Sequence, residues 1–99
     1  MSNHEITFTE AQQMTSAYQN DPIFDAQTVS CSIPKNDLIE LFENPLVQNL
    51  KVYFAKNADN ELTLVVLGAD SNNYDITNKI LNNFNKCPKL CIGNIFNNL

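Results

Sequence analysis

Two cysteines near the carboxyl end are the residues whose type and spacing best suit chemistry. Cys87 and Cys91 enclose the run Cys-Pro-Lys-Leu-Cys. A turn between two thiols at this spacing lets both reach one metal ion or form one disulfide, and structural zinc sites place about two to four residues between paired cysteines. The same two thiols could equally be unliganded small hydrophobic groups. We keep all three interpretations open.

A complete zinc site normally needs about four ligands. The soft ligands of this chain are His4, Cys31, Cys87 and Cys91. A site that uses all four would hold zinc through three thiolates and one imidazole. A site shared by two chains, each of which contributes Cys87 and Cys91, is the alternative arrangement.

Redox and nucleophilic chemistry fit the cysteines less well. Catalytic dithiols of the thioredoxin type have about two intervening residues and begin a helix, whereas three residues separate Cys87 from Cys91. Cys31 lies between two serines, but the only histidine that could act as its base is His4, close to the amino terminus. We expect Cys31 to be a buried cysteine on a strand.

The remaining polar residues predict no catalytic centre. The run from Asp70 to Asp75 resembles the start of a calcium loop, but it lacks the central glycine and the closing glutamate. Two glycines in the whole chain leave no phosphate-binding loop. An enzyme is therefore less expected than a binding protein, and we expect no cofactor other than zinc.

The charge balance excludes two classes of partner. Six lysines, no arginine and eleven acidic residues give a net charge of −5. Without a basic patch the chain cannot neutralise phosphates, so we expect neither nucleic acid nor an anionic membrane as a partner. No apolar run approaches the ~18 residues that span a bilayer, and the first residues lack the pattern of a secretory signal. These features predict a cytoplasmic protein with reduced thiols.

The elements that must position the cysteines follow from hydrophobic periodicity. A helix is predicted from Thr9, with Gln12 completing a capping box and an apolar stripe at Ala11, Met14, Ala17 and Tyr18. A short strand is expected over 27–33 and a second helix over about 35–43. Residues 50–56 alternate, a polar turn follows, and 61–69 form a strand with apolar residues on both faces. A weak third helix is expected over 75–83.

This order predicts one α+β domain over 1–99, with a small antiparallel sheet built around the hairpin of about 50–69. Two or three helices are expected to pack on one face of the sheet. The composition, 43% hydrophobic residues, allows a core of about 20 to 25 apolar side chains. Residues 92–99 are expected to form an irregular tail.

Four segments together resemble a known family. They are Ile6-Thr7-Phe8-Thr9-Glu10-Ala11 with Met14 and Tyr18, the strand 50–56, the strand 62–70, and the terminal Cys87-Pro88-Lys89-Leu90-Cys91. Across most of its length the chain resembles a family of small Bacteroidetes proteins that end in a Cys-Pro-x-x-Cys motif. Lys51 replaces an arginine usual in that family, and residues 47–49 replace a Gly-Cys pair. The resemblance implies no activity.

The sequence therefore favours a non-enzymatic binding module that associates with itself or with another protein. An exposed sheet edge or an apolar helix surface would make the contact. The alternative is a thiol-based protein that uses Cys87 and Cys91 for zinc binding or redox chemistry.

Overall fold

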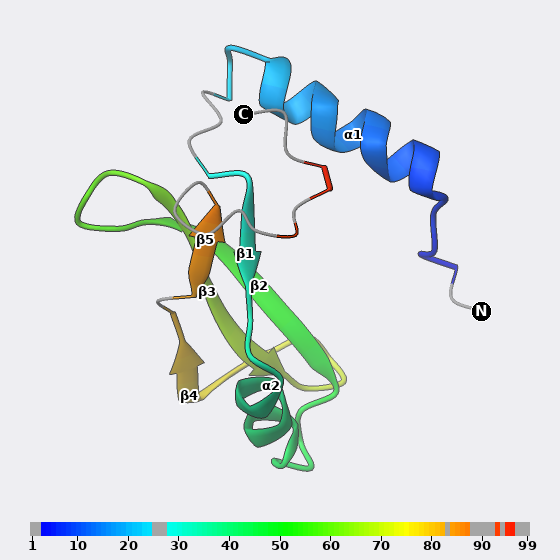
Figure 1. Cartoon of the computed structure of the whole chain (residues 1–99). Coiled ribbons are helices and arrows are strands. Elements are labelled where there is room, and N and C mark those ends of the chain that lie inside the picture. The colour runs from blue at the N-terminus through cyan, green and yellow to red at the C-terminus, as the bar shows by residue number, and fades with distance from the viewer. Residues whose placement is uncertain (1–2, 25–27, 83, 88–92, 94, 97–99) are drawn as a thin grey trace.

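The computed structural model describes residues 3–24, 28–82, 84–87, 93 and 95–96. They form an α+β fold with two antiparallel sheets (Figure 1). The first sheet pairs β1 with β5, and the second has the strand order β2-β3-β4. In chain order the elements are α1 (Phe8–Asn20), β1 (Ser30–Ser32), α2 (Lys35–Phe42), β2 (Asn49–Lys56), β3 (Leu62–Ala69), β4 (Asp75–Leu81) and β5 (Asn85–Cys87).

The predicted hairpin is confirmed as β2 and β3. The two strands pair in antiparallel register from Asn49 opposite Ala69 to Lys56 opposite Leu62. The turn between them includes Asn60, whose positive φ of 61° is a conformation that asparagine tolerates better than most residues. Alternating apolar residues and a polar turn are local signals, so this part of the fold could be predicted from sequence.

The predicted helix over 75–83 is wrong, because residues 75–81 form the strand β4. A tight turn precedes this strand. The Asp70 carboxylate accepts hydrogen bonds from the backbone N–H groups of Asn72 and Tyr74, and Asn73 has a φ of 68°. The turn sends the chain back along β3, whose second edge is then available for pairing.

A register shift lets β4 form a strand although the spacing of its apolar residues resembles that of a helix. Ile76 and Ile80 are four residues apart, as on one face of a helix. In the structure Ile76 lies opposite Gly68 and Ile80 lies opposite Leu67, with an irregularity in the ladder between these two pairs. The extra residues of the irregularity allow both isoleucines to pair with adjacent positions of β3.

The amino-terminal cap of α1 also differs from the prediction. Thr7, not Thr9, is the N-cap, and its partner in the capping box is Glu10, not Gln12. The Thr7 hydroxyl accepts a hydrogen bond from the Glu10 N–H at 3.1 Å, while the Glu10 carboxylate accepts one from the Thr7 N–H at 3.2 Å. Both reciprocal bonds of a capping box are therefore present.

The two helices relate differently to the three-stranded sheet. α2 packs against β3 at one end of the sheet, and its Glu40 forms an ion pair with Lys79 of β4 at 2.8 Å. α1 buries none of its residues and crosses the opposite end of the molecule (Figure 1). The predicted packing of two or three helices on one face is therefore not found, since of the two helices in the described residues α2 packs against β3 and α1 buries no residue.

The strand predicted over 27–33 is confirmed as the shorter β1, but β5 was not predicted. Ser30 lies opposite Cys87, and Ser32 lies opposite Asn85. The predicted irregular tail falls almost wholly outside the described residues, of which 93, 95 and 96 lie in turns.

The core formed by the described residues is small. Among the described residues seven apolar side chains are buried: Leu41, Val47, Val66, Leu67, Ala69, Phe84 and Cys87. Most of them belong to β3 or to the segments that pack against it. No helix in the described part of the chain is long and apolar enough to cross a membrane.

Candidate functional site

An exposed apolar row runs along β2. Leu50, Val52 and Phe54 alternate with Lys51, Tyr53 and Ala55, so their side chains share one face of the sheet. Leu50 is 39% exposed, Val52 41% and Phe54 79%. We call these three residues the apolar row. Adjacent exposed apolar side chains on one face make this row a candidate binding surface.

The same three residues turn their main-chain groups toward the outer edge of the sheet. The Asn57 N–H donates to the Glu61 carbonyl at 3.0 Å, which sets the phase of the β2–β3 ladder. Because hydrogen-bonded pairs alternate in an antiparallel ladder, the odd-numbered residues of β2 bond to β3. The N–H and C=O groups of the apolar row therefore point away from β3.

No strand within the described residues pairs with that outer edge. The sheet order places β2 at one edge and β4 at the other, and no ribbon runs beside the outer side of β2 (Figure 1). β4 is the less regular edge, since its ladder with β3 is interrupted by the register shift. An irregular strand is a poor template for a further strand, whereas an unbroken eight-residue edge is a good one.

A polar cluster lies on the opposite face of β2. The Lys51 ammonium contacts the Asp75 carboxylate at 2.7 Å, and the Tyr53 hydroxyl donates to the same carboxylate at 2.5 Å. The hydrogen bond from Lys51, followed by that from Tyr53, lowers the pKa of Asp75. The hydrogen bond to Asp75 in turn raises the pKa of both Lys51 and Tyr53. The charge of Lys51 is thus compensated within the chain.

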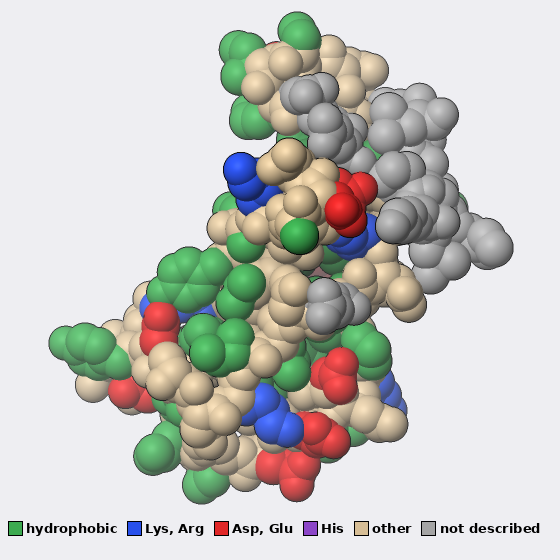
Figure 2. Space-filling model, turned by 90° about the vertical axis from the view of Figure 1, so that its left-hand side faces the viewer, with side chains coloured by type: hydrophobic (Ala, Val, Ile, Leu, Met, Phe, Trp, Pro, Cys, Tyr) green, Lys and Arg blue, Asp and Glu red, His purple; other side chains and the backbone are tan. Residues whose placement is uncertain are grey.

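Hydrophobic side chains also gather elsewhere on the surface. Figure 2 shows them over the sheet, on the side of the view away from the grey residues. Exposed large apolar residues outside β2 include Met14, Ile23, Phe24, Leu46, Tyr74, Ile80 and Ile95. The apolar row differs from these because it lies on an edge strand whose ladder has no interruption, whereas Ile80 lies on the irregular edge strand β4.

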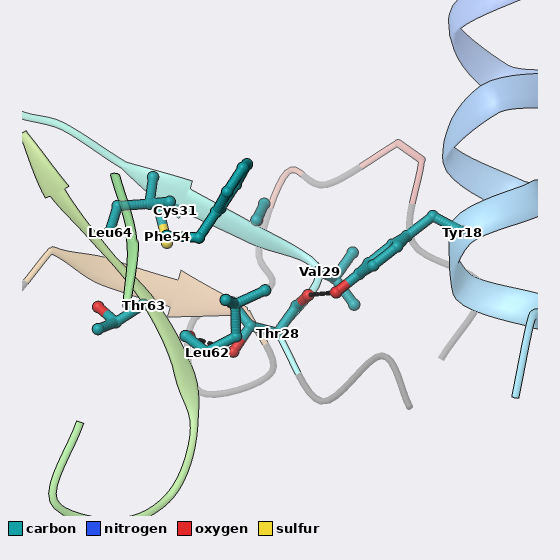
Figure 3. Close-up of a pocket in the computed structure, with 9 residues that line it drawn as sticks. Tyr18, Thr28, Val29, Cys31, Phe54, Leu62, Thr63 and Leu64 are labelled. Carbon is teal, nitrogen blue, oxygen red and sulfur yellow. Dashed lines mark hydrogen bonds between the residues drawn. The ribbon is translucent and has the colours of Figure 1, made fainter. Parts of the chain in front are cut away.

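One end of the apolar row opens into a cavity of about 320 Å³ (Figure 3). Phe54, Leu62 and Leu64 line it from the hairpin, and Val29 and Cys31 line it from β1 and the residues before it. On the side of α1, the Tyr18 hydroxyl donates to the Thr28 carbonyl at 3.0 Å, and Thr28 donates to the Leu62 carbonyl at 2.6 Å. These polar groups are already paired, so the walls offer mainly apolar contact.

Cys31 contributes a free thiol to this cavity. Desolvation raises the pKa of the Cys31 thiol, and the nearby charge of Lys86 opposes that rise only in part. A reactive cysteine needs a lowered pKa. Cys31 lies on a strand, as the sequence predicts, but it is half-buried rather than buried.

Cys87 is fully buried and disulfide-bonded. This state differs from the expectation that all three thiols are reduced. Cys91 lies outside the described residues. A sulfur held in a disulfide is not a thiolate and does not ligate zinc, so zinc binding by Cys87 would require its reduction.

The strand register separates two of the four predicted zinc ligands. Cys31 lies opposite Lys86, whereas Cys87 lies opposite Ser30. Residues directly opposite each other share a face, and successive residues alternate between faces. The side chains of Cys31 and Cys87 consequently point to opposite faces of the β1–β5 sheet, and the structure does not bring them to one centre.

His4 lies in a turn before α1, and that segment is at the end of α1 remote from β1 (Figure 1). Within residues 3–24, 28–82, 84–87, 93 and 95–96, no three histidine, cysteine or acidic side chains form a group that could hold a metal ion. The predicted set of His4, Cys31, Cys87 and Cys91 is therefore not assembled among the described residues, and zinc binding stays a prediction.

Sequence reasoning found the alternation of β2 but missed its significance. It placed Leu50, Val52 and Phe54 on one face, and only the sheet order shows that this strand is an edge. No signal within β2 marks an edge position. Comparison with known proteins adds nothing further, since no protein family, no curated protein and no solved structure matches the chain. The resemblance to the Bacteroidetes family stays a prediction.

Proposed function

We propose that this chain is a non-enzymatic protein-interaction module that binds another protein chain through its apolar sheet surface. The observation that carries the proposal is the amount of surface the fold leaves exposed. The chain exposes 7384 Å², whereas a compact monomer of 11.2 kDa exposes about 5,700 Å². The excess is larger than the ~800 Å² per partner that a standard interface covers.

The character of the exposed surface supports the same proposal. Phe54 is the most exposed residue of the apolar row, beside a cavity with apolar walls. Burial of apolar surface is the main favourable term in protein association. Binding would thus compensate for the small core of the isolated chain.

The first test is the mass of the purified protein in solution as a function of concentration. Sedimentation velocity should show reversible association between the low and the high micromolar range. Hydrophobic dye fluorescence should fall as the oligomer forms, because the exposed apolar surface becomes covered. A protein that stays monomeric throughout this range, and that also retains no protein from a cell extract, would contradict the proposal.

A second candidate is a thiol-based function, and the disulfide of Cys87 favours it. The chain contains three cysteines, and Cys31 carries a free thiol. We propose Cys91 as the disulfide partner of Cys87. A dithiol reductant would supply two electrons and two protons and release both thiols, which could then bind zinc alone or between two chains.

Mass spectrometry after alkylation tests this candidate. The untreated protein should take up one alkyl group, at Cys31, and the reduced protein should take up three. Elemental analysis of protein reduced in the presence of zinc then distinguishes a redox pair from a metal site. Two results together would rule out both the redox role and the zinc-binding role. In the unmodified protein all three thiols would react without reductant, and a Cys87→Ser, Cys91→Ser double variant would keep the same stability and metal content.

A further inference from the structure

We infer that the partner of β2 is the β2 strand of a second copy of this chain, paired antiparallel across a twofold axis at Val52. This inference rests on the proposed function and specifies its partner. The structural basis is the coincidence, in the same three residues, of exposed apolar side chains and outward-pointing main-chain groups.

The hydrogen-bonding pattern fixes which registers are allowed. The even-numbered residues of β2, which are Leu50, Val52, Phe54 and Lys56, present their main-chain groups to the outer edge, so the hydrogen-bonded pairs of a new ladder come from these residues. When the twofold axis passes through Val52, Val52 of one chain pairs with Val52 of the second copy, and Leu50 pairs with Phe54 of the second copy. Each residue offers one N–H and one C=O, which allows about six hydrogen bonds between the two strands.

The side chains fit this register on both faces. On one face the two apolar rows become neighbours and form a continuous strip across two joined three-stranded sheets. On the other face Lys51 lies opposite Tyr53 of the second copy, so the two Lys51 side chains do not face each other. Lys51 already contacts Asp75 of its own chain, and no acidic residue occurs in β2.

The alternative register, with Tyr53 on the axis, fits less well. It would place Lys56 directly opposite Leu50 and would set a charged group at the end of the apolar strip. Twofold pairing through Val52 avoids this contact and uses the same patch on both chains, as the commonest homodimers do.

The area available also suits a second copy. Over the whole molecule the surface in excess of a compact monomer is about 1,700 Å², which is more than one side of a standard dimer covers. The pairing is closed rather than open-ended, because the irregular edge at β4 offers no equivalent strand. An extended peptide of another protein is the other possible occupant, and the experiment below distinguishes it.

A proline at position 52 is the direct test. The Val52 N–H points away from β3, so Val52→Pro removes a donor only from the outer edge, where proline is tolerated. We expect a folded protein whose dimer dissociation constant rises at least about thirtyfold, since two symmetric hydrogen bonds are lost. Val52→Thr keeps the N–H and the β-branched shape, and its dissociation constant should change much less.

Hydrogen exchange of the unmodified protein provides a second measurement that does not depend on a variant folding. As the concentration rises, the amides of Leu50, Val52 and Phe54 should gain protection together, while the odd-numbered amides of β2 are protected already in the monomer. Dimerisation with no change in these three amides would overturn the inference and leave the proposed function standing.

The remaining outcomes are equally decisive. If Val52→Pro dimerises as tightly as the unmodified protein, a different surface joins the two copies. If the protein is monomeric at all concentrations but these amides gain protection when a different protein is added, the edge takes a foreign strand and the second copy is excluded. A monomer that binds nothing would overturn both this inference and the proposed function.

Discussion

Because Gly68 has no side chain, the segment before β2 can pack closely against the centre of the sheet. A Cβ atom at this position would lie 2.6 Å from Val47 Cγ2 and 2.9 Å from Val47 Cγ1. Val47 is itself buried and has a stiff, β-branched side chain, so it cannot move away easily. This close contact helps to fix α2 and its following turn against β3.

Gly68→Ala should therefore destabilise the fold by about 1–3 kcal/mol through overpacking. The free energy of unfolding in urea measures this effect. A Gly68→Ala, Val47→Ala double variant should be more stable than the sum of the two single changes predicts, because the smaller residue makes room for the new Cβ. Additive effects would show that the two side chains do not conflict.

Asp75 should contribute to stability in a pH-dependent way. Its pKa is lowered in the folded protein by Lys51 and Tyr53, so its contribution is complete above the unfolded pKa of about 4. The contribution is lost as the pH falls through the lower pKa of the folded state. Asp75→Asn should flatten the loss of stability in acid, measured as the urea midpoint against pH.

Asp59→Asn is a matched control for this experiment, since Asp59 lies in the turn between β2 and β3. The control removes the same charge away from Lys51 and Tyr53. An equal flattening by both variants would show that net charge, and not the contacts of Asp75, causes the effect.

Among the elements, α1 depends more on its own sequence than on packing. It buries no residue, and its contacts with the rest of the described chain include the Tyr18–Thr28 hydrogen bond and the Phe8–Phe96 ring pair at 5.2 Å. A helix of this length without a packed face is marginal in water. Its capping box is therefore an important part of its stability.

Thr7→Ala should increase the frequency of local unfolding of α1 and leave the stability of β3 unchanged. We expect amide exchange in α1 to become about fivefold faster, as the loss of an N-cap implies. Thr9→Ala, at the cap that the sequence predicted, should leave exchange in α1 unchanged, because Thr9 lies inside the first turn. Equal acceleration by both variants would contradict the observed helix start.

The two strands that flank β3 show how far sequence reasoning reaches at this scale. β2 is predicted because its apolar residues alternate with period two and a turn signal follows it directly. β4 was predicted as a helix because Ile76 and Ile80 have helical spacing. The local pattern of β4 is ambiguous, and the edge of β3 decides the outcome by offering hydrogen-bond partners that a helix would not use.

The whole molecule is more open than its length requires. Its radius of gyration is 15.1 Å, whereas a compact domain of this length has about 12.6 Å. Its extents of 39 × 38 × 25 Å describe a broad, flattened outline, with α1 at one end of the molecule and α2 at the other (Figure 1). This openness leaves the apolar row exposed and is the basis of the proposed binding function.

Small-angle X-ray scattering, extrapolated to zero concentration, should give a radius of gyration clearly above the compact value. Association should then raise the measured radius further as the concentration increases. A value near 12.6 Å for the monomer would mean that the chain covers its own apolar surface, and the proposed interaction would lose its main support.

The sequence by itself determined the hairpin, the two helices apart from their exact ends, and the acidic net charge of −5. These properties depend on composition or on residues close together in the chain. Only the tertiary structure decided that β2 is an edge, that β4 is a strand, and that Cys31 and Cys87 face apart. Each of these depends on which segment, distant in the sequence, lies beside the strand. Each also depends on the pairing register, because a shift of one residue would turn every side chain of a strand to the other face of the sheet.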